Sequence, residues 1–285
     1  IRPSQIFRPP RGGAALWADR RDDAAVLAFF GDEQPLSAKG RFVLARALLA
    51  RGDRRSAEHL VREAWRNDPF SADVANAALE QFGPLLNAGD FKTRMDMLLY
   101  GNDTAESALR SAKRLGSGYV ALAKARIGLD KKASNSRALL EAVPRELHGD
   151  PIYLISKAQW LRREEHFAEA ARVMQSAPRD PARLVNADEW WIERRLLARK
   201  LLDSNEPRTA YAVARDAALP ARDIYKTERE FTAGWIALRF LNDPNLAAQH
   251  FARIGVDSVN PTALARAGYW QGRAAEAAGR AQEAR

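Results

Sequence analysis

Hydrophobic side chains recur along the chain at the three- and four-residue spacing of α-helices, and no stretch predicts a β-strand. The sequence is rich in alanine and poor in valine, isoleucine and threonine over long stretches, which favours helices. Nine of the aromatic residues stand at this spacing beside leucine and alanine: Trp17, Phe42, Trp65, Trp160, Phe167, Trp190, Trp235, Phe251 and Trp270. We therefore predict an all-α fold in which these aromatic side chains pack between helices.

A period of 37 to 40 residues runs through this helical pattern. Each period contains a residue that can end a helix in the left-handed conformation, for which glycine and asparagine are best suited. These positions are Gly52, Gly89, Gly128, Glu165, Asn205, Asn242 and Gly279. Five residues later stand Ala57, Arg94, Ala133, Ala170, Ala210, Ala247 and Ala284. A turn residue followed by a small residue is typical of antiparallel helix pairs, as in tetratricopeptide (TPR) and related repeats.

The repeat is clearest at 42–69 and 153–181, and both of these segments end in Asp-Pro, which blocks continuation of a helix. Seven residues before the turn residue most repeats also have a small residue. The second repeat departs from the pattern because Phe82, at this position, and Arg94 stand where small residues are expected. The sequence at 104–115 then predicts an additional helix. We predict a right-handed α-superhelix (an α-solenoid) of about seven TPR-like hairpins, curved or ring-like.

The repeat defines the domain boundaries that we expect. Residues 37–285 form the repeat domain, and residues 1–36 are an N-terminal leader or first irregular helices. Gly279 predicts a helix end, and the following RAQEAR predicts the start of another helix. We therefore expect the sequence to be truncated within its last repeat and to belong to a longer protein.

Charge and composition narrow the classes of partner only slightly. The chain has 45 Lys and Arg against 36 Asp and Glu, a net charge of +9, which by itself would suit nucleic acid. However, the arginines alternate with acidic residues and no block of five like charges occurs, so solvated helix faces are the favoured interpretation. RNA binding rests on the charge alone. No apolar run approaches the roughly 18 residues of a membrane span, and the absence of cysteine excludes disulfides.

No catalytic, metal or cofactor site is predicted from the sequence. None of the histidines pairs with another at helical spacing, and neither a HExxH motif nor a phosphate-binding glycine loop occurs. The Glu106-Ser107 dipeptide is interpreted as the start of a surface helix, with Thr104 as its N-cap.

Several stretches nevertheless resemble one protein family. EWWIERRLLARKLLD at 189–203, EFTAGWIALRFL at 230–241 and the sequence from 250 to the end resemble the α-superhelical region of bacterial soluble lytic transglycosylases, in their α-proteobacterial form. RMDMLLY at 94–100 and AEAARVMQSAPRD at 168–180 are similar to the same family. The resemblance extends from about residue 37 to the end of the chain.

This resemblance implies a function for the whole protein. Such enzymes are periplasmic and cleave the MurNAc–GlcNAc β-1,4 bond of peptidoglycan, leaving a 1,6-anhydro end. Their single catalytic glutamate lies in a C-terminal lysozyme-like domain, in a Glu-Ser motif followed by Gly-Leu-Met-Gln. This chain lacks that segment, and Glu106-Ser107 does not match it. We therefore expect a non-catalytic scaffold, inactive alone, that holds the catalytic domain and guides glycan strands to it.

An alternative is a stand-alone TPR-like adaptor that binds a protein partner in a concave groove. For either function, the first candidates for a glycan or partner surface are Glu189, Trp190, Trp191, Arg194 and Arg195. Neighbouring residues on a helix point about 100° apart. Either one tryptophan of the pair is therefore exposed and able to stack on a sugar ring, or the second packs against the next repeat.

Overall fold

The computed structural model describes residues 17, 22–257, 260–280 and 282, and it is all-α over this part of the chain. The described residues form two compact units, and the division along the chain falls between Ala123 and Lys124. The first unit contains α2 (Asp23–Phe30), α3 (Ala38–Ala50), α4 (Arg54–Asn67), α5 (Ala72–Phe82), the 3-10 helix η1 (Gly83–Leu85), α6 (Ala88–Leu98) and α7 (Ala105–Leu115). The helix α8 (Ser117–Asp130) contains the boundary.

The second unit contains α9 (Ser136–Glu141), η2 (Arg145–Leu147), α10 (Pro151–Arg163), α11 (Phe167–Ser176), η3 (Pro181–Arg183), α12 (Ala187–Asp203), α13 (Pro207–Arg215), α14 (Asp223–Arg239), α15 (Pro244–Asp257) and α16 (Pro261–Ala277). Among the described residues there is no strand, so the predicted all-α class is confirmed. None of the described helices is long and apolar enough to cross a membrane.

Local sequence explains where many helices begin. Seven helices begin after a side chain that accepts a hydrogen bond from a free N–H group of the first turn. These N-cap residues are Ser37, Asp53, Ser71, Asn87, Asp150, Asn186 and Asn260. At α6 the cap is reciprocal, because the Asp90 carboxylate also accepts from the backbone N–H of Asn87. Proline fills the first position of α10, α13 and α16, where no N–H is needed.

Five of the seven predicted turn residues adopt the left-handed conformation. Their φ angles are 87° at Gly52, 63° at Glu165, 58° at Asn205, 51° at Asn242 and 74° at Gly279. Each of these residues ends a helix and allows the next one to fold back.

The prediction is wrong at Gly89 and Gly128. Gly89 lies in the first turn of α6, because the Asn87 cap starts a helix there. Gly128 lies inside α8, and the left-handed residue comes later, at Lys132 with φ 53°. A Cβ on Gly128 would lie 2.4 Å from Cδ1 of Leu139, so this glycine provides room for α9 and not a turn.

Consecutive helices pack as pairs within each unit. The most extensive contacts are all between consecutive helices: α14 with α15, α15 with α16, α3 with α4, α6 with α7, α12 with α13 and α10 with α11. Fully buried alanines occupy both helices of several pairs: Ala45 and Ala57, Ala158 and Ala170, and Ala198 and Ala210. Without larger side chains between them, the helix backbones can approach closely.

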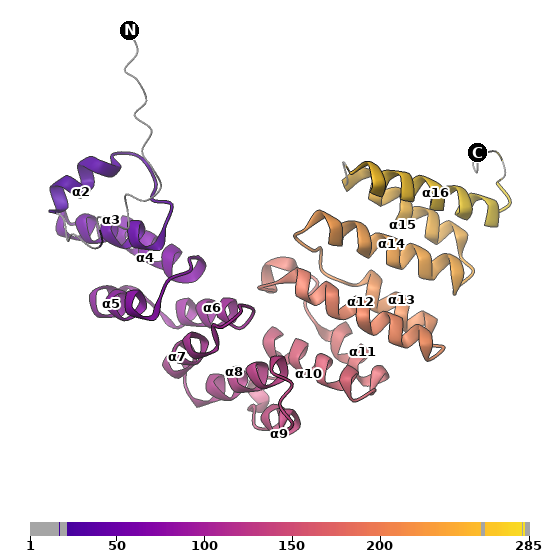
Figure 1. The fold of residues 1–285 in the computed structure, drawn as a ribbon, viewed down its shortest axis with the longest axis horizontal. Helices are drawn as coiled ribbons and strands as arrows, with labels where there is room; N and C mark the ends of the chain where they lie inside the picture. The colour runs from indigo at the N-terminus through magenta and orange to yellow at the C-terminus, as the bar shows by residue number, and fades with distance from the viewer. Residues whose placement is uncertain (1–16, 18–21, 258–259, 281, 283–285) are drawn as a thin grey trace, which may run out of the picture. The chain divides into compact units, whose positions relative to one another are not determined.

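In the second unit the pairs are arranged in two layers. Helices α10, α12, α14 and α16 each contact the next member of this series, while α11 contacts α13 (Figure 1). The first series therefore forms one face of the unit, and it is on this face that the candidate groove lies.

The packing of the first unit accounts for the departures of the second sequence repeat from the pattern. Phe82 stacks on Phe42 with ring centroids 5.8 Å apart, so the large residue fills the core between α3 and α5. The additional helix predicted at 104–115 is confirmed as α7. Thr104 stands at its N-cap position, but the hydroxyl donates to the carbonyls of Leu98 and Gly101 and does not cap the helix.

The predicted leader is described only in part. Helix α2 packs against α3, and Trp17 contacts Phe42 at 5.9 Å between ring centroids. The remaining residues of 1–36 that were predicted as a leader, 1–16 and 18–21, lie outside the described residues, as do 281 and 283–285 of the last repeat. The aromatic residues predicted as core, listed above, are all buried or half-buried.

Candidate binding site

Helix α12 carries all five residues singled out in the sequence, and it buries both tryptophans. Trp190 and Trp191 are each only 1% exposed, so of the two alternatives the structure has the one in which both tryptophans are packed. The physical reason is that α12 contacts α10, α11, α13 and α14, which cover it on several sides. Glu189 is half-buried, and its backbone N–H donates to the Asn186 cap at 3.1 Å.

Arg194 is buried as well, and its side chain binds backbone carbonyls. Its guanidinium donates to the carbonyl of Val213, at 2.9 Å, and to that of Met174. These carbonyls lie near the C-termini of α13 and α11, and the Met174 carbonyl also accepts from the backbone N–H of Ala177. Burial lowers the pKa of Arg194 to about 10, with Asp216 acting in the opposite direction, so the side chain remains charged at neutral pH.

Arg195 is the member of the five that reaches an open groove. It pairs with Glu228 of α14, and the same carboxylate accepts a 3.4 Å hydrogen bond from Nε1 of Trp191. The groove has a volume of about 550 Å³ and lies on the face formed by α12, α14 and α16. Its lining consists of Arg195, Ala198, Arg199, Leu202, Asp203, Glu228, Phe231, Thr232, Trp235, Ile236, Phe240 and Arg266.

The groove combines an apolar floor with charged groups. Trp235 and Phe240 meet edge to face with centroids 5.1 Å apart. The Arg266 guanidinium lies 3.3 Å from the centroid of Phe231, a cation–π contact. Burial lowers the pKa of Arg266, and the charge of Glu228 opposes this effect. A volume of this size, with aromatic walls and a few charged groups, is typical of ligand sites.

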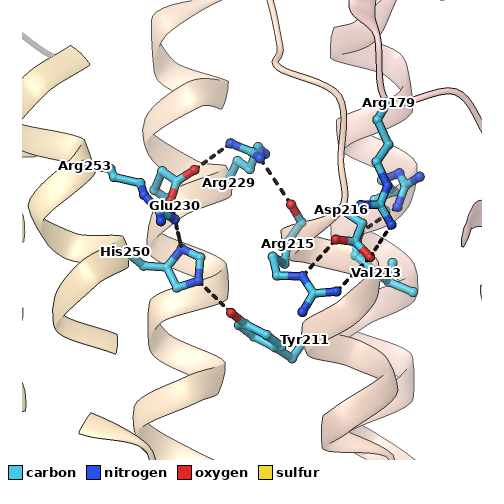
Figure 2. Close-up of polar contacts among 10 residues, drawn as sticks. Arg179, Tyr211, Val213, Arg215, Asp216, Arg229, Glu230, His250 and Arg253 are labelled. Atoms are coloured by element: carbon cyan, nitrogen blue, oxygen red, sulfur yellow. Dashed lines mark hydrogen bonds and ion pairs between the residues drawn. The ribbon is translucent and has the colours of Figure 1, made fainter. Parts of the chain in front are cut away.

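A buried polar network lies behind this groove and joins α14 to α13 and α15. His250 of α15 stands between Glu230 of α14 and Tyr211 of α13 (Figure 2). Its Nδ1 lies 2.8 Å from Oε2 of Glu230, and its Nε2 lies 2.9 Å from the Tyr211 hydroxyl. Because a carboxylate only accepts hydrogen bonds, Nδ1 carries a proton. The three side chains tie three helices together.

Cations complete the network on both sides. Arg229 donates to Glu230 and also, at 3.1 Å, to the carbonyl of Arg215 near the end of α13. Asp216 accepts two hydrogen bonds from Arg215 and one from Arg179 (Figure 2). The hydrogen bonds from Arg215 are the main reason that the pKa of Asp216 lies below its ordinary value.

A Glu–His–Tyr series could in principle move a proton, but this one is built as a structural link. All three side chains are buried, and none of them lines the groove. Burial raises the pKa of Tyr211, so its hydroxyl is a poor nucleophile at neutral pH. The described residues also contain no cluster of three metal-ligating side chains.

The sequence alone did not identify most of the groove. Trp235 was interpreted as core, and Phe231, Phe240, Glu228 and Arg266 were not singled out. A signal existed in the EFTAGWIALRFL stretch, where aromatic residues fall on more than one helix face.

Comparison with known proteins adds no family to this description, because no family model matches the chain and no curated protein matches it significantly.

Proposed function

We propose that the chain is the non-catalytic, superhelical scaffold domain of a peptidoglycan lytic transglycosylase of the soluble, α-proteobacterial type. The observation that carries this proposal is the series of helix pairs with left-handed turn residues at Gly52, Glu165, Asn205, Asn242 and Gly279, in a sequence that resembles that family. The proposed architecture is a right-handed α-superhelix of about seven TPR-like hairpins, curved or ring-like. The proposed location is the periplasm.

In this proposal the scaffold holds a catalytic domain that follows it and guides glycan strands. The groove of the second unit supplies suitable chemistry for the second task. Aromatic side chains such as Trp235 stack on sugar rings, and the arginines Arg199 and Arg266 suit the carboxylates of peptidoglycan. The whole enzyme would cleave MurNAc–GlcNAc bonds, whereas this domain would contribute position and affinity.

The mass of the native gene product in its source cells tests the proposal most directly. We expect a product well above 31.7 kDa that yields peptides of a Glu-Ser…Gly-Leu-Met-Gln domain. A product near 31.7 kDa would overturn the proposal and favour the adaptor.

Retention on purified cell-wall sacculi at low salt tests the guiding role separately. We expect Arg199→Glu, at the groove, to reduce retention about threefold to tenfold, and Arg183→Glu, at an arginine on η3 that is also exposed, to leave it nearly unchanged. If the unaltered chain is not retained, the guiding role fails while the scaffold role stands.

The second candidate function is an adaptor that binds a protein partner. The feature that favours it is the mainly apolar floor of the same groove, formed by Leu202, Phe231, Ile236 and Phe240. The mass of the native product distinguishes it from the scaffold.

A further inference from the structure

A second cavity, of about 240 Å³, lies within the first unit and has a different character from the groove. It is lined by residues of α4, α5, α6 and α7 and of the loop between α4 and α5. Its lining consists of Trp65, Phe70, Ser71, Ala75, Asn76, Leu79, Phe91, Arg94, Leu98, Ser107, Arg110, Ser111, Lys113 and Arg114.

One side of this cavity is aromatic. The Trp65 ring contacts Phe91 at 5.5 Å and Phe70 at 5.7 Å between centroids. Trp65 is 3% exposed, and its Nε1–H is buried without a hydrogen-bond partner in the described part of the chain. A buried donor of this kind costs free energy unless something accepts from it.

The charged groups of the lining all have the same sign. Four cations and no carboxylate line the cavity: Arg94, Arg110, Lys113 and Arg114. Arg94 is buried, lies 3.6 Å from the centroid of Phe70, and donates to the carbonyls of Trp65 and Asp68. Burial lowers its pKa to about 10, against the opposing effect of Asp68, so it is charged at neutral pH.

Two of the cations are available to a ligand. Arg110 is engaged by Glu106, at 2.9 Å, and by the Ser107 hydroxyl, at 2.7 Å. Lys113 and Arg114, in the last turn of α7, are exposed and have no ion-pair partner among the described residues.

The cavity also lies where the sequence repeat is broken. Arg94 occupies a position at which the repeat calls for alanine, and α7 is the additional helix. Both departures contribute side chains to the same cavity, and Arg94 and α7 supply all four of its cations. An ordinary helix pair with a small residue at position 94 would lack this charge.

We propose that this cavity binds a small organic anion, with an apolar body against Trp65, Phe70 and Phe91 and an acidic head group toward Lys113 and Arg114. The volume lies below the roughly 300–1,000 Å³ of sites for drug-sized ligands, which suits a single ring or short chain. Carboxylates and phosphates share the chemistry that these cations recognise. The site does not depend on the proposed scaffold function.

Calorimetric titration of the full chain with three matched probes tests this proposal. We use 3-phenylpropanoate, phenyl phosphate and the neutral 3-phenylpropanamide. We expect at least one anion to bind at least about tenfold more tightly than the amide, since two unpaired cations face the head group. The stronger of the two anions identifies the head group that the site prefers.

Paired variants test the location. Lys113→Gln with Arg114→Gln should weaken binding of the anion about tenfold, whereas the exposed pair Arg54→Gln with Arg55→Gln, in the same unit, should change it less than about twofold. The indole N–H resonance of Trp65, assigned with Trp65→Phe, should shift when the anion is added. Equal binding of acid and amide, equal losses in both double variants, or an unmoved Trp65 resonance would each overturn the proposal.

Discussion

Single residues with positive φ reverse the chain, and they are not all glycine. In the described part of the chain Asp103, Lys132, Glu165, Asn205 and Asn242 adopt this conformation. An L-residue with a Cβ is strained there, by about 1–2 kcal/mol. Glu165 is an extreme case. Its side chain is exposed, and it lacks the short polar group with which asparagine stabilises the left-handed conformation.

Replacement of Glu165 by glycine should therefore stabilise the chain, although glycine costs entropy on folding. We expect Glu165→Gly to raise the free energy of unfolding by about 0.5–1 kcal/mol. The neighbouring Glu164→Gly is the matched control, because φ is −84° there and the substitution should lower stability by a similar amount. Urea unfolding of both variants measures this, and the same sign for both would contradict it.

Close packing at one glycine gives a second contrast. A Cβ on Gly234 of α14 would lie 2.7 Å from Cε1 of Phe251 and 3.0 Å from Cβ of His250. We expect Gly234→Ala to destabilise the chain by about 1–3 kcal/mol through overpacking. Gly255, on α15, has open space at the corresponding position, so Gly255→Ala should be neutral or stabilising. Thermal unfolding followed by circular dichroism compares the two variants. If the stability of Gly234→Ala is unchanged, α15 shifts easily to accommodate the added Cβ.

At the scale of the helix, buried polar links hold neighbouring elements together. Burial would raise the pKa of Glu230, but the hydrogen bond to His250 and the charges of Arg229 and Arg253 outweigh this effect and hold the pKa below its ordinary value. The charged form is therefore stabilised in the folded chain. This contribution is present above the ordinary pKa of about 4.3 and is lost as pH falls through the lower pKa of the folded state.

Glu230→Gln should remove this dependence on pH. At pH 7 we expect the variant to lose about 3 kcal/mol of stability, because His250 and the arginines lose a buried anion. Between about pH 5 and pH 3 the unaltered chain should lose more stability than the variant. Urea unfolding across this range is the measurement, with Glu106→Gln, an exposed carboxylate, as control. Parallel pH profiles for Glu230→Gln and the unaltered chain would count against the link.

The helices could be predicted from the sequence better than the groove could, and particular residues show why. Caps such as Ser71 and Asn260 act within a few residues of themselves, so the starts of helices such as α5 and α16 depend on local sequence. Gly128 misled the prediction because its role depends on Leu139, a residue of the next helix. The groove requires α12, α14 and α16 to be placed side by side, and no local pattern gives that placement.

At the scale of the whole molecule, the described residues form two units, and each contains its own packed helices. In arrays where a helix pair contacts mainly its neighbours, damage at one position stays local. Ala210 of α13 is fully buried, so a larger side chain there must push α13 from its neighbours.

Hydrogen exchange of Ala210→Leu tests this locality. We expect amide protection to fall about tenfold or more in α12, α13 and α14 and to stay nearly unchanged in α3 and α4 of the first unit. Ala252→Leu, at an exposed position of α15, should change protection in neither unit. A uniform loss over all described helices would mean that the chain unfolds as one cooperative body.

Several arginine side chains donate hydrogen bonds to backbone carbonyls near the ends of neighbouring helices. Arg94 donates to the end of α4, Arg163 to the carbonyl of Leu129 in α8, and Arg194 to both α11 and α13. A planar guanidinium can reach two carbonyls at once, whereas an ammonium is a compact point donor. The sequence has 36 arginines and nine lysines, in keeping with such a role.

The consequence concerns which sequences can share this fold. Exchange of arginine for lysine is usually regarded as conservative, and at Arg54 or Arg55 on the surface it should be. At Arg194 it would replace a guanidinium that donates to the carbonyls of both Val213 and Met174 by a compact ammonium. Related chains should therefore drift freely in total charge while retaining a guanidinium at a few interior positions, and the arginine that persists would mark a helix junction more reliably than a ligand site.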